Sequence, residues 1–172
     1  MMTEKSALFI DGSNFHSTLK LMNLDIDYIK LLDYFQQKSR LLRAYYYTAL
    51  PDVSEPNNLR RLIDFLDYNG YQIVSKQTKE FVNQATGEKR IKGNMDMELA
   101  LDMLKLAPHI DHAYLFSGDG DFCRLLEDVQ NMGVQVSVVS STRTQPNMVA
   151  DALRRRADSF IELDDIIAEI RR

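Results

Sequence analysis

The segment Phe9-Ile10-Asp11-Gly12-Ser13-Asn14, residues 9–14, decides the fold class of this chain. It ends an apolar run, residues 7–10, in an aspartate followed by a glycine that permits a tight turn. Such a run is typical of a buried strand, and the Ser-Asn pair is typical of a helix start. The segment therefore predicts a strand-turn-helix unit with Asp11 at the carboxyl end of the strand. The alternative is an ordinary turn, because Asp-Gly is common after a strand.

A second apolar run, residues 113–116, is followed by Ser-Gly-Asp-Gly-Asp-Phe at residues 117–122. Asp119 and Asp121 stand two positions apart among small residues, which leaves space for an ion and its waters. The alternative for Asp121 is a helix N-cap, a position that aspartate favours. Because parallel strands of an open α/β sheet bind ligands in a crevice at their carboxyl ends, both runs are predicted to place carboxylates in that crevice.

Short apolar runs alternate with helix-period segments along the whole chain, which is typical of a mostly parallel sheet covered by helices. The polar stretch 76–93 interrupts this pattern and predicts a hairpin arm with its tip at 83–87. We therefore expect an α/β fold in a single domain, residues 1–172. The expected strands are 7–10, 41–48, 71–75, 112–116, 134–139 and 159–161. The expected helices carry Phe15 to Met22 and Tyr28 to Phe35, then span 57–68, 95–106, 121–131 and 147–156, with a terminal helix capped by Asp164 or Asp165.

The composition fits one globular domain, with 172 residues that are 45% hydrophobic and 27% charged. A net charge of -4 argues against a protein that coats nucleic acid through overall positive charge. The single cysteine, Cys123, excludes an internal disulfide, and residues 1–5 lack the apolar stretch of a signal peptide or membrane helix. We expect a cytoplasmic protein with no membrane partner.

A further acidic residue, Asp96, opens the helix-period segment 95–106. Asp102 follows roughly 600° later around that helix, so it points away from the Asp96 face and is expected at the edge of the site or beside a basic side chain. Glu98 is expected on the solvated surface.

Like charges gathered in a crevice need a cation, a proton or separation by water. Oxygen-only ligands suit Mg²⁺ or Mn²⁺.

Six segments together resemble the NYN domain of the LabA/DUF88 group, which is similar to PIN-domain and flap-nuclease folds. They are FIDGSN (9–14), KGNMD (92–96), ALD (100–102), SGDGDF (117–122), GVQV (133–136) and ADSFI (157–161). The resemblance implies a three-layer PIN-like (Rossmann-like) fold with five or six strands and a Mg²⁺- or Mn²⁺-dependent ribonuclease site. It also implies that Asp11 and Asp119 are central metal ligands, that Asp96 and Asp121 complete the catalytic cluster, and that Asn14 assists. KGNMD has one residue more than the commoner K-G-x-D form.

Water is the expected nucleophile, since the acidic motifs contain neither histidine nor cysteine. His16 and His112 lie near the motifs, but a lone histidine is more often packed or solvent-facing than catalytic. The predicted activity is that of an endoribonuclease that leaves a 5′-phosphate and a 3′-hydroxyl. Asn14 and Ser117 are candidate substrate contacts beside the acidic cluster.

The arm is the candidate contact for an RNA backbone. Residues 76–92 contain five basic and two acidic side chains, a net charge of +3 in an acidic protein. Lys92 and Arg90 are the best candidates, because they precede the acidic helix most closely. The alternative is a solvated hairpin whose charges keep its edge soluble.

Other enzyme classes fit the motifs less well. A haloacid-dehalogenase phosphatase needs an aspartate at position 13, which is serine, and a receiver domain needs one after the third strand, where Ser75-Lys76-Gln77 stands. No Gly-rich dinucleotide or P-loop motif is present. The remaining rival is a non-catalytic RNA- or protein-binding regulatory module that keeps the acidic pocket. A homodimer is compatible with either function.

Overall fold

The computed structural model describes residues 4–50 and 58–172, and for residues 79–81 and 89–92 it describes the backbone alone. Its main element is a six-stranded sheet in which every neighbouring pair of strands is parallel. In spatial order the strands are β3 (Gln72–Gln77), β2 (Arg40–Leu50), β1 (Lys5–Asp11), β6 (His112–Phe116), β7 (Gln135–Ser140) and β8 (Ser159–Glu162). The chain runs outward from β1 through β2 to β3, then returns to β6 and continues to β8. The strand order therefore reverses between β1 and β6, which is where open α/β sheets bind ligands.

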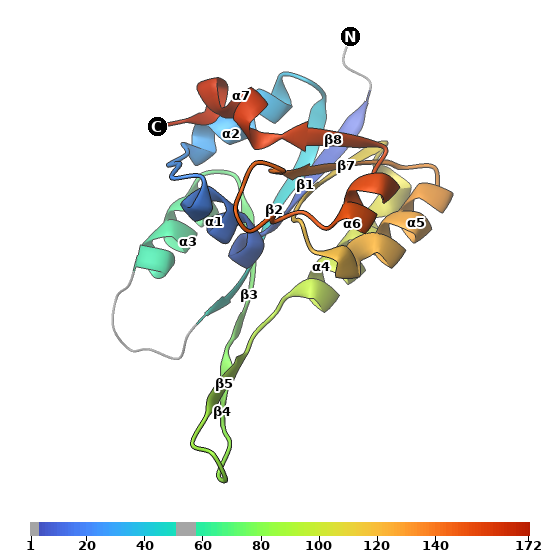
Figure 1. Ribbon diagram of the computed structural model, residues 1–172. Coiled ribbons are helices and arrows are strands. Elements are labelled where there is room, and N and C mark those ends of the chain that lie inside the picture. The colour runs from blue at the N-terminus through green and yellow to red at the C-terminus, as the bar shows by residue number, and fades with distance from the viewer. Residues whose placement is uncertain (1–3, 51–57) are drawn as a thin grey trace.

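Helices cover both faces of this sheet and make the three layers predicted from the sequence (Figure 1). Alternate residues of β1 point to opposite faces, so Leu8 and Ile10 join one core while Ala7 and Phe9 join the other. The first core is covered by α1 (Gly12–Leu21), α2 (Tyr28–Gln36), α3 (Asn58–Tyr68) and α7 (Leu163–Ile170). The second core is covered by α4 (Asp96–Leu106), α5 (Cys123–Asn131) and α6 (Asp151–Arg156).

The predicted hairpin arm is confirmed. Strands β4 (Lys79–Val82) and β5 (Lys89–Lys92) pair with each other in antiparallel register and project away from the body of the molecule (Figure 1). Residues 82–88, which include the tip, are all exposed. The arm is therefore an appendage and not part of either core.

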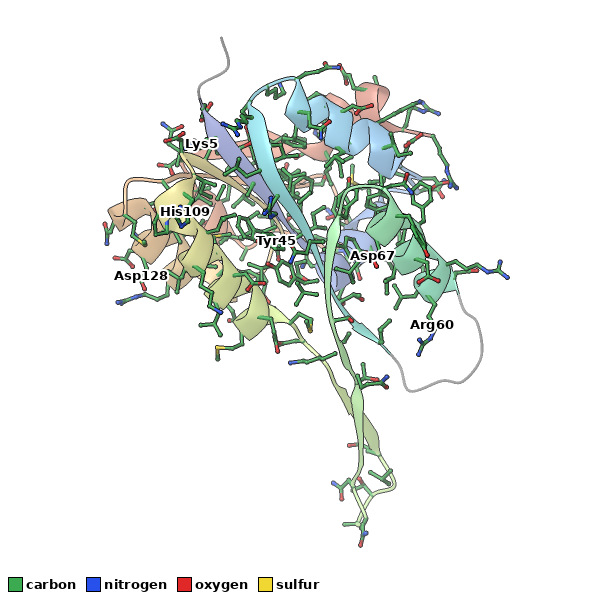
Figure 2. The ribbon with its side chains drawn as sticks, turned by 180° about the vertical axis from the view of Figure 1, so that it is seen from behind. Lys5, Tyr45, Arg60, Asp67, His109 and Asp128 are labelled. Atoms are coloured by element: carbon green, nitrogen blue, oxygen red, sulfur yellow. The ribbon has the colours of Figure 1, made fainter. Side chains whose placement is uncertain are left out.

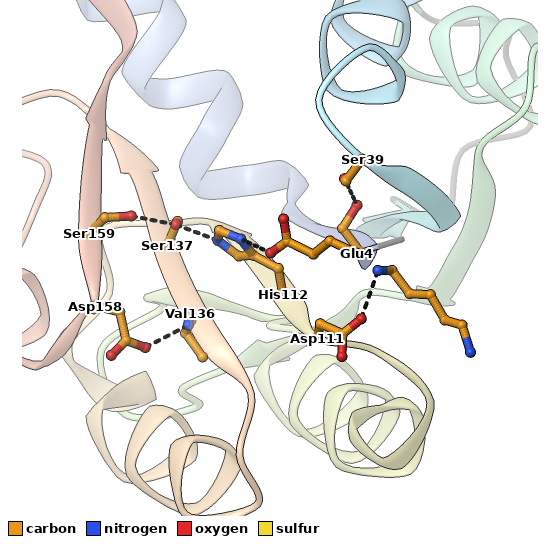
Figure 3. Close-up of polar contacts among 10 residues, drawn as sticks. Glu4, Ser39, Asp111, His112, Val136, Ser137, Asp158 and Ser159 are labelled. Carbon is orange, nitrogen blue, oxygen red and sulfur yellow. Dashed lines mark hydrogen bonds and ion pairs between the residues drawn. The ribbon is translucent and has the colours of Figure 1, made fainter. Parts of the chain in front are cut away.

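The amino end of the sheet is closed by polar contacts between neighbouring segments (Figure 3). The backbone N–H of Lys5 donates to Asp111 over 2.8 Å. The His112 ring contacts Glu4 through Nδ1 (3.1 Å) and Ser137 through Nε2 (2.6 Å). His112 is thus packed into the structure far from the carboxyl ends of the strands, which remain open for a site.

Two helices begin at other residues than the sequence predicts. The helix expected over 147–156 begins only at Asp151, because the Asn147 side chain accepts from the N–H of Val149 and holds an irregular loop. The terminal helix is not capped by Asp164 or Asp165: it begins at Leu163, and both aspartates contact Arg143 instead. The start of the helix expected from residue 57 lies outside the described residues. In 4–50 and 58–172, every helix is too short or too polar to cross a bilayer.

Candidate metal centre

The ends of β1 and β6 are joined by side-chain hydrogen bonds. Asp11 ends β1, and its carboxylate accepts from the Ser117 hydroxyl (2.9 Å) and from the backbone N–H of Asn14 (3.4 Å). Asp11 is therefore the N-cap of α1. The Asn14 side chain instead accepts from the N–H of Gly118 over 3.0 Å. These bonds fix the Asp11 carboxylate at the point where the strand order reverses.

The loop after β6 gives its two aspartates different roles. The Asp119 side chain accepts from the N–H of Asp121 over 2.9 Å, so Asp119 caps the 3₁₀ turn Gly120–Phe122 that precedes α5. The carboxylate of Asp121 is exposed, and the alternative that Asp121 acts as the N-cap was wrong. Ser117 is buried, and its oxygen donates to Asp11 while it accepts from the N–H of Asp119. Ser117 thus positions the acidic residues and is not placed to contact a substrate.

Helix α4 brings a third aspartate to this point. Asp96 is its first residue, and the backbone N–H of Asp96 donates to the Asn94 side chain over 3.2 Å. One carboxylate oxygen from each of Asp96, Asp119 and Asp121 lies within 4.8 Å of the other two. The extra residue in the KGNMD segment therefore does not turn Asp96 away. Asp11 lies outside this 4.8 Å group, although it faces the same cavity as Asp96 and Asp119.

The cluster has an excess of negative charge. Burial and the nearby carboxylates of Asp11, Asp119 and Asp121 raise the pKa of Asp96 from 3.8 to about 7. Burial raises the pKa of Asp11 as well, and the hydrogen bond from Ser117 opposes that rise. A proton or a cation must balance such a group at neutral pH. The four side chains offer only carboxylate oxygens, which fit a hard divalent cation such as Mg²⁺ or Mn²⁺.

Three of these acidic residues, Asp11, Asp96 and Asp119, line a cavity of about 630 Å³ at the carboxyl end of the sheet. Its walls come from α1, from the end of β2, from the start of α3 and from the segments at both ends of the arm. The lining residues besides the three aspartates are Gly12, Ser13, Asn14, His16, Ser17, Tyr46, Tyr47, Thr48, Ala49, Leu59, Thr78, Gly93, Asn94, Met95 and Met148. Asp121 stands at the outer side of the cluster and does not line this cavity.

Two glycines allow the close packing around the cluster. A Cβ at Gly12 would lie 2.5 Å from the backbone oxygen of Tyr47, and one at Gly118 would lie 1.8 Å from that of Met148. Both distances are far shorter than any van der Waals contact. Glycine is therefore required for β2 and the 144–149 loop to approach the acidic turns.

The sequence matches the NYN domain over residues 5–164. This chain belongs to the NYN domain family. The Low amplitude and bright protein LabA of Synechococcus elongatus is 34% identical over 163 residues, which cover 93% of this chain and 84% of that protein. A crystal structure of a protein of unknown function from Vibrio parahaemolyticus aligns with a TM-score of 0.74 and 26% identity, covering 94% of each chain. The NYN domain is a member of the PIN-like nuclease superfamily, which usually uses divalent metals.

A hydrogen bond beside the candidate metal centre of this NYN domain was not predicted from the sequence. Asp102, expected at the edge of the site or beside a basic side chain, accepts a hydrogen bond over 3.0 Å from the hydroxyl of the buried Tyr47, which itself lines the cavity. Glu98, expected to be solvated, is partly buried and pairs with Lys76 over 2.9 Å. Strand alternation predicts that Tyr45 and Tyr47 share a face, but no local pattern identifies Asp102 on α4 as the partner of Tyr47.

Lys92 and Arg90 are the two residues of the arm that were predicted to contact RNA. Lys92 and Arg90 lie outside the residues whose side chains are described. The backbone shows where the arm joins the NYN domain, because Thr78 before β4 and Gly93 after β5 both line the cavity. The arm therefore begins and ends at the rim of the acidic site.

Proposed function

We propose that this NYN domain is a Mg²⁺- or Mn²⁺-dependent endoribonuclease. The observation that supports it best is the convergence of Asp96, Asp119 and Asp121 within 4.8 Å, beside Asp11 and a cavity of about 630 Å³. Membership of a nuclease superfamily supports the same reaction class. A structural scaffold would gain nothing from carboxylates that raise one another's pKa.

The protein's own side chains hold and orient the reacting groups. Hydrogen bonds from Ser117 and the Asn14 N–H fix the Asp11 carboxylate, and the N–H of Asp121 fixes that of Asp119. When bound, a divalent cation supplies charge neutralisation of the phosphodiester and an activated water. The Asn14 side-chain oxygen accepts from the N–H of Gly118. The NH₂ group of Asn14 is therefore the donor that is left to bind a phosphate oxygen in the cavity.

RNA is the proposed substrate on two grounds. The superfamily acts on nucleic acid, and the sequence of the arm carries a net charge of +3 over residues 76–92. Because the arm joins the body at the rim of the cavity, a strand bound along it would enter beside Asp96. We propose that Lys92 and Arg90 contact the phosphates of that strand.

Cleavage of end-labelled RNA by the purified protein tests this proposal. We expect product in Mg²⁺ or Mn²⁺, none in EDTA, and a loss of about 100-fold or more in the Asp119→Asn variant. The matched control is Asp67→Asn, which removes an exposed carboxylate on α3 and should retain full activity (Figure 2). Equal cleavage by Asp119→Asn would reject the assigned site. RNA binding without cleavage in any metal would identify the non-catalytic module instead.

A further inference from the structure

The two edges of the six-stranded sheet differ in how they are protected. The edge strand β8 has only four residues, and the Arg154 guanidinium lies over the Phe160 ring, 5.1 Å from its centroid. Short edge strands and charged side chains are common defences against pairing with another chain. The opposite edge strand, β3, has six residues, and among the strands of the described residues it pairs only with β2. Figure 2 looks onto this free edge, which lies between α3 and α4.

The free edge of β3 presents a regular row of backbone hydrogen-bonding groups. Directly after β3, the N–H of Thr78 donates to the backbone oxygen of Leu50 over 2.7 Å, on the β2 side. Successive residues of a strand direct their N–H and C=O groups alternately to its two sides, so Ile73, Ser75 and Gln77 direct theirs away from β2. In an antiparallel pair centred on Ser75, this residue lies opposite its own copy and Ile73 lies opposite Gln77. The strand is therefore complementary to itself.

Charge does not oppose the approach of an identical face. The one basic residue of β3, Lys76, pairs with Glu98 of α4 over 2.9 Å, so its charge is balanced within its own chain. Helix α3, strand β3 and residues 97–106 of α4 together carry four basic and four acidic side chains, a net charge of zero. They are Arg60, Arg61, Lys76 and Lys105 against Asp64, Asp67, Glu98 and Asp102. A neutral face on a chain with a net charge of -4 fits a second copy better than a polyanion.

Apolar side chains are exposed on both helices that flank this edge. Phe65 and Tyr68 are exposed on α3, and Met97 and Leu101 are exposed on α4. They are four of the eight large hydrophobic side chains that are exposed in the described residues. Exposed apolar side chains beside an unpaired strand edge are typical of an interface with another chain.

We propose that the protein forms a two-fold symmetric dimer in which the β3 strands of two copies pair in antiparallel register. The two sheets then form one continuous sheet. Because the two-fold axis is perpendicular to that sheet, α3 lies beside α3 of the partner and α4 lies beside α4 of the partner. The two β3 strands point in opposite directions, so each acidic cavity opens at its own end of the dimer. This interface is independent of the proposed ribonuclease reaction.

Sedimentation velocity of the full chain tests the dimer. We expect the native protein to sediment with the mass of two chains. Leu101→Lys places a charge in the interface and should raise the dimer dissociation constant at least about tenfold. Met132→Lys is the matched control, because Met132 is 49% exposed and Leu101 is 48% exposed. Met132 ends α5, which packs beside β7, so this variant should dimerise like the native protein.

The Ser75→Cys variant tests the register. In the proposed pairing, the two copies of Ser75 have their Cα atoms about 5.5 Å apart, which is within the range that a disulfide spans. We expect this variant to give a disulfide-linked dimer on a non-reducing gel after mild oxidation. Gln72→Cys changes an exposed residue at the other end of the pairing, far from its own copy, and should not cross-link. The native protein, whose single cysteine is Cys123, should not cross-link either.

Three results would overturn this interface. They are a monomeric native protein, a Leu101→Lys variant that dimerises as tightly as Met132→Lys, and a dimer in which Ser75→Cys cross-links no more than Gln72→Cys. None of the four substituted residues lines the acidic cavity, so failure of the dimer leaves the ribonuclease proposal standing. Thermal unfolding of each variant checks that the substitutions leave the fold intact.

Discussion

Asp96 is the residue at which the acidic cluster should make stability depend on pH. Its unfolded carboxyl titrates near 3.8, whereas in the metal-free fold its pKa is about 7. Between these values the folded state keeps a proton that the unfolded chain has lost, so the stability contributed by protonated Asp96 declines as pH rises. In EDTA, Asp96→Asn should exceed the native protein in unfolding free energy by about 1–2 kcal/mol at pH 8, after allowing for partial exposure. The difference should vanish near pH 4.

Urea unfolding at the two pH values measures this difference. Asp67→Asn, an exposed acid on α3, serves as the control and should show no such dependence on pH. In saturating Mg²⁺ at pH 8, the native protein should have the larger unfolding free energy. The reason is that Mg²⁺ bound by the Asp96 carboxylate stabilises the native protein and not the Asp96→Asn variant. If the unfolding free energies of Asp96→Asn and the native protein depend on pH in the same way, the pKa of Asp96 is not raised in the folded state.

Gly118 is the residue at which one added methyl group should cost the most. Its Cβ would meet the Met148 backbone oxygen at 1.8 Å, so the 144–149 loop would have to move away from the end of β6. We expect Gly118→Ala to lower the unfolding free energy by about 2–3 kcal/mol. Gly87→Ala at the arm tip meets no atom within 4 Å and should cost about 1 kcal/mol, through its positive φ alone. Similar denaturation midpoints for the two variants would contradict this difference.

At the scale of elements, α4 is held against β2 by the hydrogen bond from Tyr47 to Asp102. Tyr47→Phe removes this bond and should destabilise the protein by about 1–2 kcal/mol. Because α4 also carries Asp96, we expect Mn²⁺ affinity to fall about tenfold, as measured by isothermal titration calorimetry. Tyr45→Phe, on the same strand and half-buried, should leave Mn²⁺ affinity unchanged. Equal affinity in the Tyr47 variant would show that Asp96 is positioned without this bond.

The elements that could be predicted from sequence are those with a strong local pattern. The apolar runs of β1 and β6, each followed within four residues by an Asp-Gly pair, predicted two buried strands whose ends meet. Residues 147–150 were mistaken for helix. The Thr144 hydroxyl accepts from the N–H of Met148 and the Asn147 side chain accepts from the N–H of Val149 in place of helical bonds, and no hydrophobic periodicity indicates such contacts. The cap of α7 was misassigned because Arg143, distant in sequence, pairs with the candidate aspartates.

The same distinction applies to the candidate site. Its four aspartates were predictable, since the motifs place them at strand or helix ends that parallel topology brings together. The different roles of these aspartates could not be predicted, because each role depends on which backbone N–H donates a hydrogen bond to the carboxylate. No sequence pattern places His16 and Leu59 at the same cavity, because they come from separate helices and share no motif.

At the scale of the whole molecule, the arm is predicted to be dispensable for folding. Among the strands of the described residues, β4 and β5 pair only with each other, and residues 82–88 are exposed. Thr78 and Gly93 lie close together, with 2.7 Å between a Thr78 methyl carbon and the position of a Cβ on Gly93. An Asn-Gly turn can therefore replace residues 79–92. We expect the unfolding free energy of this variant to stay within about 1 kcal/mol of the native value in urea titrations.

The same deletion should change how RNA binding depends on salt. If Lys92 and Arg90 each contact one phosphate of a single strand, the slope of log K against log salt should become shallower by about 1.4, at roughly 0.7 per contact. Replacing Arg154 and Arg155 by serine removes two exposed charges from α6 instead, and should leave the slope unchanged. Fluorescence anisotropy titrations in roughly 50 to 200 mM KCl measure this slope for both variants. A slope that persists after the arm is deleted would place the strand on another surface, because counterion release depends on which cations meet the phosphates and not on the net charge of the protein.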